Sequence, residues 1–245
     1  MAFNADGTQA AAIEVNSESD FVSKNPEFIE FVEKLAAIAL AADKVDENSI
    51  LEMPYGSEGT VKDVLTNKIA TIGENMNIRR VVKCATPGMK YVGYSHQGGR
   101  IGVIIGLETE ASVEDVTVVG KDVAMQIAAL NPRFWDKSDV TPDVLEAEKK
   151  VMLAQMDNDP KMASKPQQVK EKIVEGKLNK FYSENCLLQQ DFVKDGEFTV
   201  EKYIASAAKA LGGAVKFNDA IRFEKGEGIE KRQDDLAAEV AKMIQ

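Results

Sequence analysis

The chain has 245 residues, of which 44% are hydrophobic and 29% are charged, and its formal net charge is -10. This composition is typical of a globular protein with one large domain or two small ones. An acidic chain is a poor candidate for a dedicated nucleic-acid binder, because attraction to phosphates needs a basic surface. One histidine excludes HExxH metalloproteases, and two cysteines without CxxC spacing give no support to zinc or thioredoxin-like chemistry.

Membrane and cofactor motifs are not found in the sequence. The longest apolar run, residues 35–42, is far shorter than the roughly 20 residues that span a bilayer. The N-terminus does not resemble a secretory signal. Phosphate-loop, dinucleotide-binding and GxSxG patterns are missing. We therefore expect no membrane partner, no cofactor, no metal and no direct nucleic-acid contact. We expect two reduced thiols and a cytoplasmic location in a bacterium, with an organelle as the alternative.

Hydrophobic periodicity and turn residues predict alternating helices and strands. Pro26 and Pro142 stand where helices begin, and Gly73 and Gly212 follow helices as C-terminal caps. Residues 44–59 are typical of a loop. Helices are predicted over 26–43, 61–72, 112–130, 142–157, 166–184, 200–211 and 234–243, and strands over 11–15, 78–84, 91–95, 101–107 and 221–224.

Two sets of these elements resemble each other. Strand, turn and helix over 11–42 match those over 101–130 at an offset of about 90 residues. Thr60 and Thr199 open matching helices at an offset roughly 50 residues larger, which indicates an insertion in the second copy. We predict an α+β fold with two related small α/β-sandwich subdomains, each an antiparallel sheet with helices. The second carries an inserted antiparallel coiled-coil hairpin, and a C-terminal helix follows. The predicted boundaries are 1–86 for the N-terminal core subdomain, 87–226 for the C-terminal one with its insertion at about 142–184, and 227–245 for a C-terminal helical module.

The inserted hairpin has an apolar seam and charged outer faces. Lys, Glu and Gln dominate those outer faces, which favours a projecting arm. The alternative is that the hairpin folds back on the body as part of the core. The seam pairs Val144, Leu145, Val151, Met152 and Met156 with Val169, Ile173, Val174, Leu178 and Phe181.

The turn after the first strand holds the most specific motif. Residues 14–25 read Glu-Val-Asn-Ser-Glu-Ser-Asp-Phe-Val-Ser-Lys-Asn, which resembles the signature of the translation elongation factor Ts family. That family usually has Thr at the position of Ser19, and the hydroxyl is retained here. Three further stretches resemble the family in the same order, 72–80, 96–103 and 222–231. By this resemblance we expect the chain to correspond to the core dimerisation region of the family, without the ubiquitin-associated-like domain that normally precedes it.

The resemblance implies a guanine nucleotide exchange factor and not an enzyme. Its partner would be elongation factor Tu, bound in the GDP form and in the nucleotide-free form. The factor would promote GDP release and exchange for GTP during translation elongation. Because such coupling is reciprocal, a factor that weakens GDP binding holds the empty partner most tightly. The resemblance also allows for a homodimer through the core subdomains.

The resemblance further implies which residues touch the partner. Ser19, Asp20, Phe21 and Val22 match the family's Asp-Phe wedge, which dislodges magnesium and nucleotide in elongation factor Tu. Without the family, Phe21 could be a hydrophobic staple on its own helix, Asp20 a turn former and His96 a satisfied turn residue. Further partner contacts are implied for Ile72, His96, Val200 and Met243, and structural ion-pairing roles are predicted for Arg79, Arg80 and Arg222.

Two other functions remain open from the residues alone. Asp20 with Glu14 or Glu18 could form a pair of catalytic carboxylates, but the cleft of such an enzyme is lined by aromatics and the chain has one Trp and five Tyr. The other alternative is a helical-hairpin adaptor on the ribosome or on RNA, without exchange activity.

Overall fold

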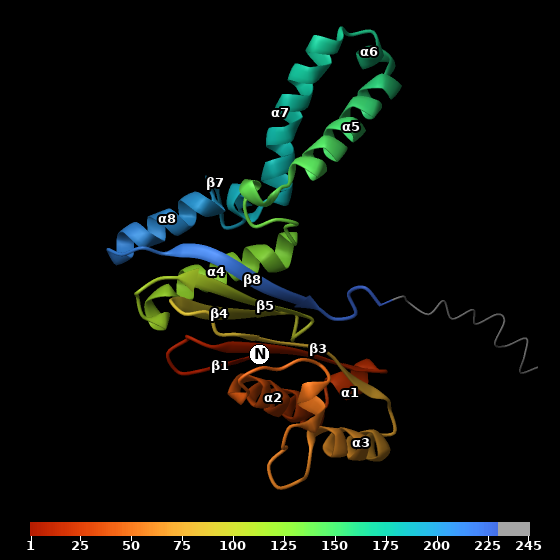
Figure 1. Cartoon of the computed structure of the whole chain (residues 1–245), viewed down its shortest axis with the longest axis vertical. Coiled ribbons are helices and arrows are strands. Elements are labelled where there is room, and N and C mark those ends of the chain that lie inside the picture. Colours follow the sequence, from red (N-terminus) through yellow and green to blue (C-terminus); the bar gives the residue numbers. More distant parts are fainter. Residues whose placement is uncertain (230–245) are drawn as a thin grey trace, which may run out of the picture.

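The computed structural model describes residues 1–229, so the predicted helix 234–243 and Met243 lie outside the described residues. Figure 1 shows helices and sheets in successive layers, with α2 and α3 outside the first sheet and α4 and α8 outside the second. The first sheet has the order β1-β2-β3 and the second has the order β4-β5-β8. These small antiparallel sheets with their helices confirm the predicted α+β fold.

The first unit begins with a short strand that the sequence did not predict. Its elements are β1 (Ala2–Phe3), β2 (Ala10–Ser17), α1 (Asp20–Ser23), α2 (Pro26–Ala41), a 3-10 helix (Ser49–Glu52), α3 (Val61–Ile72) and β3 (Met76–Cys84). Helix starts follow local chemistry, since the Asn25 side chain caps α2 and Thr60 forms a capping box with Asp63 at α3. Gly73 ends α3 in the left-handed conformation, as predicted.

The second unit repeats this pattern with a long insertion between its two covering helices. Its elements are β4 (Met89–His96), β5 (Ile101–Glu108), α4 (Val113–Leu130), α5 (Pro142–Asn158), α6 (Pro160–Ala163), α7 (Gln167–Asn185), β6 (Asp191–Phe192), β7 (Asp195–Thr199), α8 (Val200–Leu211), β8 (Lys216–Glu224) and two 3-10 helices (Lys137–Asp139, Leu187–Gln189). The small strands β6 and β7 and the one-turn helix α6 were not predicted, and β8 begins five residues before the predicted strand at 221.

The two sheets pack face to face. Ala10 and Ala12 of β2 lie in one buried cluster with Met89, Tyr91 and Ile104 of the second sheet. Because successive side chains of a strand point to opposite faces, the residues between them pack against the helices instead. Ala11 therefore joins the cluster beneath α2, while Val103, Ile105 and Leu107 join the cluster beneath α4. This inter-sheet layer joins the two units into one body.

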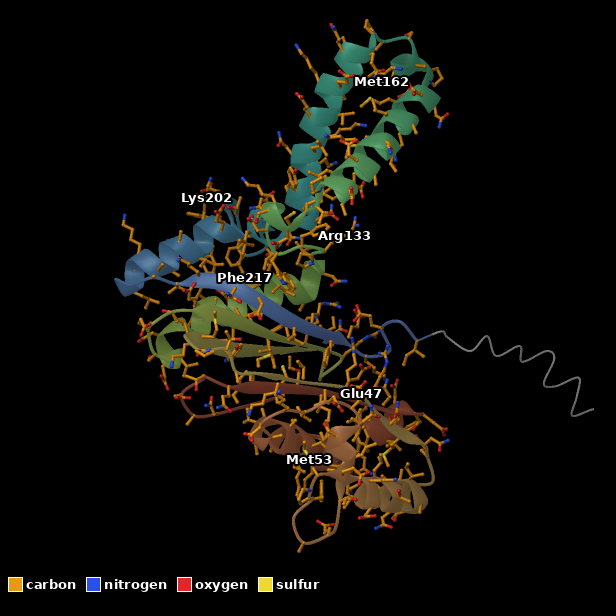
Figure 2. The ribbon with its side chains drawn as sticks, viewed as in Figure 1. Glu47, Met53, Arg133, Met162, Lys202 and Phe217 are labelled. Carbon is orange, nitrogen blue, oxygen red and sulfur yellow. The ribbon has the colours of Figure 1, made fainter. Side chains whose placement is uncertain are left out.

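The helices α5 and α7 form an arm that extends away from the sheets (Figure 1). Figure 2 shows Met162 at its far end and Arg133 close to its base. The base is held by aromatic packing, in which Phe134 and Phe181 have ring centroids 6.5 Å apart. Trp135 in turn packs on Phe217 of β8 at 5.6 Å. The arm projects, as the charged outer faces suggested, and the coiled-coil geometry and the three subdomain boundaries stay predictions.

Among residues 1–229, none of the helices combines the length and the apolarity that a membrane crossing requires.

Candidate functional site

The α1 turn, residues 18–25, presents one aromatic side chain to solvent. Phe21 is 90% exposed, the largest exposed fraction among the large hydrophobic side chains of the described residues. Its neighbour Val22 is 8% exposed and packs with Phe28 and Met76. The staple alternative required Phe21 to pack on its own helix, and its exposure rules that out. Val22, one residue further along, anchors the turn instead.

The start of α1 is held by a residue from the loop after α3. The Ser19 amide donates to Glu74 Oε2 at 2.9 Å, and the Ser19 hydroxyl donates to Glu74 Oε1 at 2.6 Å. The same hydroxyl accepts from the Val22 amide at 3.3 Å and so caps the helix. A second contact between the same segments joins Asn75 Nδ2 to Glu18 Oε1 at 2.7 Å. Glu74 is therefore a structural support for the motif 18–22, and the Asn75 contact is an exposed one beside it.

Asp20 is paired with a lysine from the far end of the chain. Lys225 Nζ lies 2.6 Å from Asp20 Oδ1, although both side chains are largely exposed. The hydrogen bond from Lys225, then its charge and those of Lys24 and Arg100, hold the pKa of Asp20 below its ordinary value. Asp20 is therefore ionised at neutral pH.

An ion-pair network holds the segment that carries Lys225. Glu14, only 8% exposed, accepts from Arg79 at 3.2 Å and from Arg80 Nε at 2.5 Å. Arg80 also donates to the Glu224 carbonyl at 3.0 Å, and the Gly226 amide donates to Glu14 at 3.2 Å. Burial alone would raise the pKa of Glu14, but these hydrogen bonds outweigh burial and lower it. The predicted ion-pairing roles of Arg79 and Arg80 are confirmed.

Arg222 has the third predicted ion-pairing role, which is also confirmed. Its guanidinium lies 2.7 Å from Glu224 and 3.5 Å from Glu227.

A groove of about 680 Å³ adjoins the α1 turn. It runs between α2, β2 and the turn that joins β4 to β5. Its lining mixes apolar side chains with charges of both signs. The charged residues are Glu14, Asp20, Lys24, Glu33, Arg100 and Lys225, and the larger apolar ones are Met1, Ile13, Val15, Phe28, Ile29, Val32 and Phe223.

The other predicted contact residues lie in different environments. Ile72 is half-buried and packs against the cluster of Val22, Phe28 and Met76, so it supports the α1 turn from the interior side. His96 ends β4, is half-buried, and shares a 2.9 Å hydrogen bond between its Nδ1 and the Tyr94 hydroxyl. Val200 is fully buried in the core of the second unit. Its side chain is therefore not available to a partner on the described surface. Met243 lies outside the described residues.

Sequence reasoning placed Ser19, Asp20, Phe21 and Val22 together but missed the two residues that hold them. Glu74 and Lys225 lie inside motifs that the sequence singled out, and no role was assigned to either. Sequence spacing could not supply one, because the contacts span 55 and 205 residues.

The paired-carboxylate alternative fits the geometry poorly. A glycosidase-like pair needs one carboxyl whose pKa is raised, so that it can donate a proton. The pKa values of Glu14 and Asp20 are both lowered. Glu14 is buried and engaged by arginines, Glu18 is exposed and accepts a hydrogen bond from Asn75, and Asp20 lies exposed at the start of α1. Within residues 1–229, no cluster of three or more His, Cys, Asp or Glu could hold a metal ion.

Phe21 is an almost fully exposed aromatic side chain on a capped turn, and aromatic side chains of this kind are enriched at the centres of protein–protein interfaces. The family model described as "Elongation factor TS" matches residues 18–227. The chain belongs to the elongation factor Ts family, a family of translation elongation factors in protein biosynthesis.

The relatives extend this likeness over nearly the whole chain. Elongation factor Ts of Clostridioides difficile (strain 630) is 44% identical over 241 residues, which are 98% of this chain and 78% of that protein. Elongation factor Ts of Clostridium kluyveri (strain ATCC 8527) is 43% identical over 242 residues, with the same coverage. Elongation factor Ts of Clostridium botulinum (strain Eklund 17B / Type B) is 41% identical over 239 residues, again with the same coverage.

Proposed function

We propose that the chain is a guanine nucleotide exchange factor that binds elongation factor Tu in its GDP form and promotes exchange of GDP for GTP. Family membership gives the reaction, and one observation supports the means. Phe21 is 90% exposed while the residue after it is buried. Exposure of so large an apolar surface is unfavourable in water, and a partner that buries it gains about 2–3 kcal/mol.

The proposed mechanism is a wedge. Phe21 enters between elements of the partner's nucleotide-binding domain, and Asp20 brings a carboxylate that is already ionised. Together they displace the groups that hold magnesium, and GDP leaves. No covalent bond changes in this mechanism, so all of the effect is a coupling free energy between two binding events. Through the same reciprocal coupling, GTP binding weakens the binding of the factor and releases it.

Location and assembly belong to the same proposal. The factor acts in the cytoplasm, where translation takes place, and the similar proteins come from bacteria. A homodimer through the core subdomains is part of the proposal. Because the inter-sheet faces are filled within one chain, such a dimer would use other faces. Light scattering of the purified chain measures its mass directly.

The test follows release of a fluorescent GDP analogue from elongation factor Tu, with and without this chain. We expect faster release, and we expect calorimetry to show that affinity for the partner falls as the GDP concentration rises. The reciprocal coupling requires both results. Affinity that does not depend on GDP, together with an unchanged release rate, would refute exchange activity.

The adaptor alternative rests on the projecting arm. Its helices carry exposed lysines on the outer faces, including Lys150, Lys172 and Lys180. If the arm binds RNA, affinity should collapse with added salt, because phosphate contacts release counterions. Tight, salt-sensitive RNA binding by a chain that does not stimulate GDP release would favour the adaptor over the exchange factor.

A further inference from the structure

Phe21 receives no direction from packing within its own chain. With 90% of its surface exposed, its position depends on the backbone that carries it. That backbone is α1, a helix of four residues. A single helical turn is unstable alone, because nucleation fixes several dihedral angles for one hydrogen bond. Whatever fixes the α1 turn therefore also fixes Phe21.

One carboxylate makes two hydrogen bonds to the first residue of this turn. Both oxygens of Glu74 are used, one by the Ser19 amide at 2.9 Å and one by the Ser19 hydroxyl at 2.6 Å. Glu74 follows Gly73, which closes α3 in the left-handed conformation, and it precedes β3 by two residues. The carboxylate is thus carried by a short segment fixed at both ends.

The hydrogen bond from the Ser19 hydroxyl to Glu74 also determines which further hydrogen bond that hydroxyl can accept. A serine hydroxyl has one proton and two lone pairs. When Glu74 accepts that proton, the lone pairs are left free for the Val22 amide, which donates at 3.3 Å. A single acceptor therefore orients the cap that holds Val22 in the core and turns Phe21 outward.

Two other side-chain contacts of the turn are weaker supports. The pair of Asp20 with Lys225 is exposed on both sides, at 72% and 52% of the side chain. Exposed ion pairs of this kind contribute little to stability. The hydrogen bond between Asn75 and Glu18 is also exposed. Glu74 acts on the partly buried cap itself.

We propose that Glu74 is the positioning residue of the wedge, which sets the direction of Phe21 by orienting the Ser19 cap. This inference rests on the proposed exchange function. In this role Glu74 changes how fast the bound partner releases GDP more than it changes the stability of the chain. A residue that only stabilised the fold would lower stability and leave the maximal rate of the folded molecules unchanged.

The experiment compares Glu74→Ala, Glu74→Gln and the matched control Asn75→Ala. Maximal stimulated GDP release is measured at saturating factor, and thermal unfolding is measured on the same samples. We expect about a tenfold loss of the maximal rate for Glu74→Ala, equivalent to about 1.4 kcal/mol. Glu74→Gln retains one acceptor oxygen and should fall between Glu74→Ala and the wild type. Asn75→Ala should match the wild type.

A double-mutant cycle shows whether Glu74 acts through the cap. Ser19→Ala and Glu74→Ala both break the hydrogen bond between the Ser19 hydroxyl and Glu74, so the loss of rate in the double variant should be smaller than the sum of the two single losses. Fully additive losses would overturn the proposal. Wild-type maximal rates in Glu74→Gln and in folded Glu74→Ala would also overturn it. If Glu74→Ala does not fold, the maximal rate of Glu74→Gln alone tests the proposal, and a wild-type rate would overturn it.

A direct readout separates this inference from the exchange function. Amide hydrogen exchange at Ser19 and Val22 reports the cap in the free chain, with no partner present. We expect faster exchange at both amides in Glu74→Ala and unchanged exchange in Asn75→Ala. If the wild-type chain fails to stimulate GDP release, the proposed function fails while this measurement still tests whether Glu74 orients the Ser19 cap. Unchanged protection in Glu74→Ala would overturn that role of Glu74 even if the chain is an active exchange factor.

Discussion

The two units share a core and differ in how their elements are connected. In the first, β2 ends at Ser17 and α2 begins at Pro26, and the connection holds the α1 turn. In the second, β5 ends at Glu108 and α4 begins at Val113. That shorter connection leads directly into α4, and its Ser112 caps the helix by accepting from the Asp115 amide at 3.2 Å. The same strand-to-helix step is extended in only one unit.

The second unit is extended elsewhere, between α4 and α8, by the arm. Each copy of the fold therefore has its own added segment at a different connection, and both additions lie at the surface. Repeated packing makes a stable body, while connections between packed elements can lengthen without disturbing it. The comparison indicates that the proposed function belongs to an added segment, the α1 turn, and not to the sheets and helices that the two units share.

The largest expected effect tests the shared core. Phe31 of α2 is 1% exposed and Ile127 of α4 is fully buried. Phe31→Ala should cost about 3–5 kcal/mol of unfolding free energy and Ile127→Ala about 2–5 kcal/mol, because each leaves a cavity. Since the two sheets pack on each other, both variants should lower one common unfolding transition, measured by calorimetry. Two separate transitions, with each variant shifting only one, would show that the units are independent.

The second prediction concerns Phe21, where we expect a large effect on GDP release and a small effect on stability. Phe21→Ala should change stability by about 0.5 kcal/mol or less, because the side chain is exposed. It should slow stimulated GDP release about thirtyfold, since a buried interface aromatic is worth about 2 kcal/mol. The rate is measured per folded molecule, with melting temperature measured in parallel.

The matched control for Phe21 lies in the second unit. Val118 of α4 is also an exposed apolar residue, 68% exposed. Val118→Ala should leave both stability and GDP release unchanged. A large fall in melting temperature for Phe21→Ala, with normal release from the folded fraction, would contradict the wedge.

Much of this architecture could be read from local patterns. Periodicity and caps predicted the main helices, because those signals lie within a few residues of each other. The repeat was visible for the same reason, since β2 with α2 and β5 with α4 follow one pattern. The elements that were missed are short or have weak local signals. They are β1, α1, the two strands β6 and β7, the one-turn helix α6 and the three 3-10 helices.

The candidate site was predicted in part. The motif placed Asp20 and Phe21 on the turn, and the resemblance gave them a role. The contacts that hold the turn depend on how β3 pairs with β2 and on how β8 pairs with β5 in the facing sheet, and no local pattern encodes that. Glu74 and Lys225 therefore appeared only with the structure. Val200 shows the converse, because a matched position in the sequence proved to be fully buried.

A smaller effect is expected for the arm. Deleting residues 149–177 and joining the ends with a short Gly-Ser linker keeps Glu148 beside Arg133 and Phe181 beside Phe134. Because antiparallel helices bring the cut ends close together, the body should lose about 1 kcal/mol or less. Thermal unfolding measures this. Removal of 142–181 also takes away Phe181 and should destabilise more. Aggregation of the shorter deletion would mean that the arm is part of the core.

The smallest effect concerns the pair between Asp20 and Lys225, which only the first unit has at its strand-to-helix turn. Because Lys225 holds the pKa of Asp20 below its ordinary value of 3.8, the stabilisation from the pair is fully present above that value. It is lost as the pH falls through the lowered pKa of the folded chain. At neutral pH Asp20 is ionised with or without Lys225.

Lys225→Met should raise the Asp20 pKa toward 3.8 in an NMR titration of its carboxyl carbon. Lys24→Met should raise that pKa less, because Lys24 contributes a smaller part of the shift. Exposure of both side chains, at 72% and 52%, keeps the change in stability small. Any slowing of GDP release by Lys225→Met at neutral pH must then come from the position of the carboxylate and not from its charge. An Asp20 pKa that stays unchanged in Lys225→Met would show that the pair does not persist in solution.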